Sequence, residues 1–184
     1  MTFEEYLNYF EQIILNPEQY PIYKDENYYQ YAKLNWSRTN RWLNKFEPTD
    51  ELKTLISSIK EPQTWIIITE PWCGDAAHSV PQLINIAENN PLITIDVQLR
   101  DDEPFLINNY LTNGGKSIPK VIFRNANNED VAVWGPRPQK LQDLFLFWKE
   151  EGVEFNTMKE SIQKWYNEDK GVEIQNDLIK LFAV

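Results

Sequence analysis

The chain passes from a strand to a helix within residues 65–90, which read WIIITEPWCGDAAHSVPQLINIAENN. The β-branched run over residues 65–69 has no polar alternation, which predicts a strand buried on both faces of a sheet. Apolar residues then recur at helical spacing, which predicts a helix over residues 75–90 with Pro81 inside it, where a proline kinks the axis. Cys73 stands at the junction of these two elements.

Outward from this stretch, strands and helices alternate. From residue 63 onward the expected order is β-α-β-α-β-β-α, which favours an α/β layered domain. The remaining expected elements of this part are strands over 92–99, 120–124 and 130–134, a helix over 104–111 and a helix after Pro138. Helices are also expected on either side, beginning with a capping box at Thr2 and Glu5. We therefore expect a core over 63–150 with helical extensions over 1–62 and 151–184, forming one compact domain.

The composition excludes several classes of protein. Of 184 residues, 42% are hydrophobic, and 28 acids against 18 bases give a net charge of −10. This balance suits a globular protein and argues against a nucleic-acid partner, because phosphate backbones attract basic surfaces. The N-terminal sequence has no basic start with a long apolar run, and no apolar run elsewhere reaches the length of a membrane span. We expect no membrane association and a cytoplasmic location.

The single cysteine limits the kinds of site that the chain can form. One thiol cannot close a disulfide within the chain, and one cysteine with one histidine cannot assemble a metal site. At the start of a helix, the backbone N–H groups would stabilise a Cys73 thiolate, which is the nucleophilic form. The alternative is that Cys73 is a small buried apolar side chain. Its place at the end of a strand favours a functional role, because α/β sheets bind ligands there.

Four features in the correct order resemble the thioredoxin family. Residues 72–81 are similar to that family's Trp-Cys-Gly-Pro-Cys segment, with Pro81 at the place of its helix-kinking proline. Residues 117–119 resemble the segment around its cis-proline, and Gly135 resembles the glycine after its fourth core strand. The Trp-Cys-Gly-Asp-Ala motif and a later Trp-Gly-Pro-Arg-Pro resemble a bacterial thioredoxin-like subfamily. The resemblance covers residues 63–150 and implies a thioredoxin fold with a central mixed sheet flanked by helices.

The resemblance and the local sequence together give a candidate site around Cys73 as the catalytic residue. The cis-proline would present the Ile118 backbone to an extended substrate. Trp72 and Trp134 could form an apolar platform beside the thiol or simply pack in the core. Arg137 could offset Asp75, bind a carboxylate or lie in solvent. The candidate substrate-binding residues are Trp72, Gly74, Asp75, Ile118, Pro119, Trp134 and Arg137.

The departures from the family pattern are equally informative. Ala76 replaces the second cysteine, so a mixed disulfide on Cys73 would have no neighbouring thiol to resolve it, and Ile67 replaces an acid that assists proton transfer. Asp75 replaces the motif proline, where it would cap the helix but also raise the pKa of the thiol. We expect His78 to be a partly exposed structural residue, with proton transfer as the alternative.

A basic face is expected on the helix that carries Arg38, Arg41 and Lys45, either solvated or binding an anion.

The leading expectation is thus a monothiol redox protein, possessing no cofactor, whose mixed disulfides are resolved by an external thiol. Its partner would be a protein or a low-molecular-weight thiol or disulfide. The alternative is a non-catalytic thioredoxin-fold binding or adaptor protein. A one-thiol peroxidase is a third interpretation, disfavoured because the chain has no Thr-x-x-Cys arrangement. The sequence leaves open whether Cys73 is catalytically active.

Overall fold

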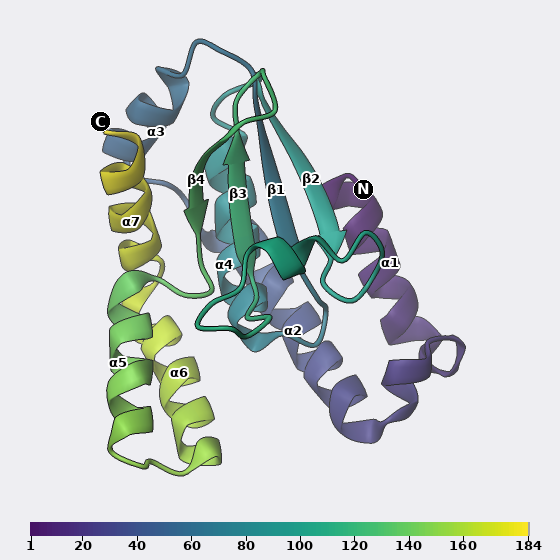
Figure 1. Ribbon diagram of the computed structural model, residues 1–184. Helices are drawn as coiled ribbons and strands as arrows, with labels where there is room; N and C mark the ends of the chain where they lie inside the picture. Colours follow the sequence, from purple (N-terminus) through teal and green to yellow (C-terminus); the bar gives the residue numbers. More distant parts are fainter. Residues whose placement is uncertain (184) are drawn as a thin grey trace.

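A four-stranded mixed sheet stands at the centre of the computed structural model, which describes residues 1–183 (Figure 1). The strand order is β2-β1-β3-β4. β1 runs parallel to β2 and antiparallel to β3, and β3 and β4 form an antiparallel hairpin. The strand bounds are β1 Gln63–Thr69, β2 Ile93–Leu99, β3 Lys120–Arg124 and β4 Asp130–Trp134. The α/β fold with a mixed sheet that the sequence predicts is confirmed.

The central position of β1 explains its unbroken apolar sequence. Ile67 pairs with Val97 of β2 on one side and with Val121 of β3 on the other, and all three side chains are buried. A strand with neighbours on both edges and layers on both faces has no position that favours a polar side chain. Because β1 and β2 are parallel, their carboxyl ends lie at the same end of the sheet, where Cys73 follows β1.

Seven α-helices surround this sheet among the described residues. In Figure 1, α4 lies behind the sheet with α2 packed against it, α1 lies beside the edge strand β2, α7 lies beside β4, and α5 and α6 lie below β4. The helices are α1 Phe3–Leu15, α2 Glu26–Lys45, α3 Asp50–Ser57, α4 Gly74–Ala87, α5 Gln139–Glu150, α6 Phe155–Asp169 and α7 Val172–Phe182, and short 3₁₀ helices η1 Pro17–Gln19, η2 Pro21–Lys24 and η3 Leu106–Asn109 complete the set. The chain's two helical ends therefore flank the same core.

Local signals explain where several of these helices begin and break. The capping box is present, with Thr2 Oγ1 accepting from the Glu5 backbone N–H at 3.2 Å. The break between α6 and α7 falls at Lys170 and Gly171, both with positive φ. A Cβ on Gly171 would lie 2.6 Å from Cε2 of Phe46, so only glycine fits there without a shift. α4 continues through Pro81.

The expected helix over residues 104–111 is wrong in extent. Only Leu106–Asn109 is helical, as a single 3₁₀ turn. Phe105, immediately before it, has φ of 53° and ψ of 46°, a left-handed conformation that a continuous right-handed helix cannot include. Within residues 1–183, no helix combines the length and apolar character needed to span a bilayer.

Candidate functional site around Cys73

Cys73 is the N-cap residue of α4, and its side chain is buried, with 7% of the residue exposed. Its Sγ donates to the backbone carbonyl oxygen of Ile118 at 3.4 Å. The Ile118–Pro119 peptide bond is cis, as the resemblance implies. The loop before β3 thus faces the thiol, but the Ile118 carbonyl that was expected to receive a substrate strand already accepts from the thiol.

Burial controls the ionisation of this thiol. Removal from water disfavours the thiolate, and the nearby Asp75 carboxylate adds to the effect, so that the pKa of Cys73 is raised to about 12. The backbone N–H groups of Ala76 and Asp75 and the Arg137 guanidinium lower it, but by less. The N–H groups at the helix start therefore lower the pKa of Cys73 as the sequence suggests, but burial raises this pKa by more. At neutral pH the side chain is a thiol, not a thiolate.

Asp75 does not cap the helix but forms a buried polar cluster. Its Oδ2 lies 2.8 Å from Nη2 of Arg137, and the hydroxyl of Tyr166 donates to its Oδ1 at 3.0 Å. Burial raises the pKa of Asp75, while Arg137 and Tyr166 oppose that shift. The cluster ties the start of α4 to α6 and to the loop before α5. Arg137 is therefore not a solvated loop residue.

His78 is buried, with 1% exposed, so the expectation of a partly exposed histidine is wrong. The indole N–H of Trp42 donates to its Nδ1 at 2.9 Å, which leaves Nε2 to carry the proton and donate to Oε1 of Gln163 at 2.8 Å. The imidazole also stacks on the ring of Tyr166. Burial lowers the pKa of His78 to about 3. His78 is thus a neutral link between α2, α4 and α6.

A cavity of about 540 Å³ opens beside the thiol, between α2, the start of α4 and the α5–α6 pair. Five of the predicted site residues line it: Trp72, Cys73, Gly74, Asp75 and Arg137. Ile118, Pro119 and Trp134 are not among its lining residues. The indole N–H of Trp134 instead donates to Oδ2 of Asp177 in α7, at 3.0 Å. The structure thus brings most, but not all, of the candidate residues to one cavity.

The other walls of the cavity come from the helical extensions. They include Tyr28, Tyr31 and Arg38 from α2 and Phe155 and Lys159 from α6. Sequence reasoning did not connect these residues with Cys73, because they lie far from it in the chain. The sequence pointed to these residues only in part: Arg38 was expected on a basic helix face, and aromatic residues were noted in both helical extensions.

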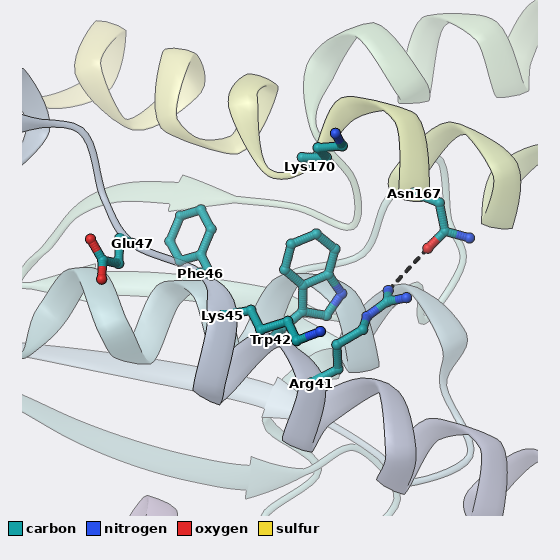
Figure 2. Close-up of a pocket in the computed structure, with 7 residues that line it drawn as sticks. All are labelled: Arg41, Trp42, Lys45, Phe46, Glu47, Asn167 and Lys170. Carbon is teal, nitrogen blue, oxygen red and sulfur yellow. Dashed lines mark hydrogen bonds between the residues drawn. The ribbon is translucent and has the colours of Figure 1, made fainter.

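The expected basic face of α2 divides between two places. Arg38 lines the cavity beside Cys73, whereas Arg41 and Lys45 line a separate hollow together with Lys170. Figure 2 shows this second hollow, with the Arg41 guanidinium donating to Oδ1 of Asn167 at 3.0 Å. Seven residues are nearly two full turns, so positions 38 and 45 lie on the same side of the helix, about 10 Å apart along its axis. One basic stripe thus reaches two separate hollows along α2.

Glu70 is a buried carboxyl group that the sequence reasoning missed. It directly follows β1, is 7% exposed, and accepts from the backbone N–H of Asp101 at 3.2 Å. It shares with Cys73 a small void of about 10 Å³, too small for a ligand. Burial raises the pKa of Glu70 to about 7. An acid directly after a buried strand was the available signal.

This buried carboxyl group predicts a loss of stability as pH rises. Between its ordinary pKa of 4.5 and about 7, Glu70 keeps its proton in the folded chain but releases it in the unfolded chain. The free energy of unfolding should therefore fall as pH rises from 5 to 8, by about 2–3 kcal/mol for this group. Glu70→Gln should not show this fall of about 2–3 kcal/mol. Urea unfolding of the wild type and of Glu70→Gln at pH 5 and pH 8 measures the difference. An exposed control, Glu88→Gln, should follow the wild type, and parallel behaviour of Glu70→Gln and wild type would refute the assignment.

The described residues offer no separate metal centre. Among residues 1–183, no three histidine, cysteine, aspartate or glutamate side chains gather where they could hold a metal ion.

Comparison with known proteins supports the fold. No curated protein matches the chain. A protein of unknown function from Pseudomonas aeruginosa superposes with a TM-score of 0.60 at 15% identity, covering 80% of this chain and 83% of its own. An HIV epitope scaffold superposes with a TM-score of 0.58 at 14% identity, covering 83% of this chain and 88% of its own. At these identities the likeness concerns the fold alone.

The family itself is given by a sequence comparison. A family model described as thioredoxin matches residues 22–168, which is most of the chain and includes Cys73, Pro119 and Gly135. The match extends beyond the expected core into both helical extensions. The chain belongs to this thioredoxin family.

Proposed function

We propose that this protein is a thioredoxin-fold binding protein, which holds a ligand in the cavity beside Cys73 without thiol chemistry. The observation that carries the proposal is the state of the thiol: Cys73 is buried, donates to Ile118 and has a pKa raised to about 12. A second cysteine, which the dithiol cycle of the family requires, is replaced by Ala76. The cavity, by contrast, has a volume typical of small-molecule sites.

A second candidate is the monothiol redox protein that the sequence favours. Its support is the position of Cys73, at the N-cap of a 14-residue helix and in the wall of the cavity. In that reaction the Cys73 thiolate attacks one sulfur of a disulfide, the other sulfur leaves as a thiolate, and a mixed disulfide forms. A second molecule's thiol must then attack the mixed disulfide and release Cys73. Loss of the Cys73 proton is the unfavourable step here, because it must occur in a buried site beside Asp75.

Exchange with glutathione disulfide distinguishes the two candidates. We expect the folded protein at pH 7.5 to gain little or no mass from glutathione over an hour, because almost none of Cys73 is ionised. The urea-unfolded chain, measured in parallel by intact mass spectrometry, should form the mixed disulfide readily, and Cys73→Ser should form none in either state. Rapid, complete adduct formation on the folded wild type would overturn the binding proposal and establish monothiol exchange.

A further inference from the structure

We propose that the cavity beside Cys73 takes a small organic anion with an aromatic or aliphatic body. This inference rests on the proposed function and names its ligand class. The cavity of about 540 Å³ falls within the range of small-molecule sites and is bounded on three sides by α2, α4 and the α5–α6 pair. A bounded cavity of this size suits a small molecule better than a folded protein surface.

The walls favour an apolar body for the ligand. Tyr31, Leu34 and Phe155 line the cavity and still expose 42%, 48% and 59% of their surface. Trp72 and Phe145 add two further aromatic rings. Apolar surface that remains in water at a cavity is stabilised when a ligand covers it. Aromatic walls from both helical extensions therefore point to a ring or an alkyl chain as the body.

The charges favour an anion. Three cations line the cavity, and its single acid, Asp75, is already paired with Arg137 at 2.8 Å. The other two cations have neutral partners: Arg38 donates to Oδ1 of Asn35 at 3.0 Å, and Lys159 donates to the hydroxyl of Tyr31 at 2.9 Å. Among residues 1–183, neither has a carboxylate within 4.0 Å. In a chain of net charge −10, two unpaired cations at one cavity are a specific anion-binding feature.

The position of Arg38 indicates where the anionic group binds. Its side chain is half-buried, and Nη1 lies 3.9 Å from the point that a Cβ on Gly74 would occupy, next to Cys73. A carboxylate or sulfonate near Gly74 could therefore accept charge-assisted hydrogen bonds from Arg38 in a partly dry environment. Lys159 lies over the ring of Phe155, which lines the same cavity and is largely exposed. The two cations would contact different parts of the ligand.

A pair of fluorescent probes tests the assignment. Anilinonaphthalenesulfonate combines an aromatic body with an anion, and N-phenylnaphthylamine has the same body without the charge. We expect the anionic probe to bind the wild type more tightly. Arg38→Gln should weaken it at least about tenfold, because one charge-assisted contact is lost, and Lys159→Gln should weaken it as well. The neutral probe should bind wild type and both variants within about twofold, which also shows that the cavity is intact.

Arg41→Gln is the matched control, since Arg41 is on the same helix but lines the other hollow (Figure 2). Equal binding of the two probes, or an unchanged affinity of the anionic probe in Arg38→Gln, would overturn the anion assignment and leave the proposed binding function standing. A loss in Arg41→Gln alone would place the anion site in the other hollow and also overturn it. Failure of both probes to bind wild type would count against the cavity as a binding site, and hence against the proposed function.

A competition experiment decides the size of the occupant. Decanoate, a small anion with an aliphatic body, should displace the anionic probe from wild type, whereas polyglutamate at equal charge concentration should not. Displacement by polyglutamate but not by decanoate would show that the site takes an acidic polypeptide, and the small-molecule assignment would be wrong.

Discussion

In the folded protein at pH 7, Cys73 should react with iodoacetamide about 50 to 100 times more slowly than in the urea-unfolded chain. With a pKa raised to about 12, the thiolate fraction is smaller by a factor of about 3,000 than for an ordinary thiol with a pKa near 8.5. A more basic thiolate is intrinsically more nucleophilic, which returns roughly a factor of 30 to 60. The net factor is about 50 to 100, before any hindrance from the buried position is counted.

The same reaction tests which group holds the thiol protonated. Asp75→Asn removes the negative charge nearest to Cys73 among the causes of its raised pKa and leaves Arg137 as an unpaired cation, so alkylation should accelerate. Glu160→Gln, an exposed change of equal charge on α6, should leave the rate unchanged. Since an unpaired buried arginine destabilises the fold, the variant must first show a native circular dichroism spectrum. A folded wild type that reacts as fast as its unfolded chain would refute the protonated resting state.

Gly135→Ala should destabilise the protein by more than about 3 kcal/mol. Gly135 follows β4 with φ of 106°, and an added Cβ would lie 2.3 Å from the carbonyl oxygen of Pro119. Both the backbone conformation and the close approach of the loop that precedes β3 exclude a side chain at Gly135. The change should therefore disturb the loop that faces Cys73 as well as the fold.

Gly152→Ala provides the matched control for this substitution. Gly152 also has a positive φ, of 69°, but no atom lies within 4 Å of the position of an added Cβ. It should lose only about 1 kcal/mol, from the backbone conformation alone. Urea unfolding of the two variants measures the difference. Equal losses would show that the approach of Pro119 to Gly135 contributes nothing.

The sequence predicted the sheet well, because its signals are local. The run over residues 65–69 is apolar without alternation since β1 has a strand on each side and is buried. The hairpin of β3 and β4 is found at the predicted residues 120–124 and 130–134. The helix after Cys73 begins where the unbroken apolar run of β1 gives way to apolar residues at helical spacing. Each of these features depends on residues that are close together in the chain.

The candidate site was predicted less completely, because its electrostatics depend on contacts between distant segments. The helix start suggested an activated thiol, but burial under the surrounding segments raises the pKa instead. His78 was expected to be partly exposed, yet Trp42 from α2 and Tyr166 from α6 enclose it. Arg38 was expected as one member of a basic stripe, whereas in the structure it lines a cavity whose other walls include Gln163 of α6. None of these packings leaves a periodic signal in the sequence.

The pH dependence of Cys73 alkylation tests the central claim most directly, since its midpoint reports ionisation whereas the rate at one pH also includes access. Rates should be measured on the folded protein in short pulses at closely spaced pH values, with Cys73→Ser as the blank. A site in which the thiol is only a protonated wall of the binding cavity predicts a rate that still rises at pH 10, with a midpoint near 12. A midpoint at or below about 8.5, the ordinary thiol value, would contradict it and restore Cys73 as an activated nucleophile.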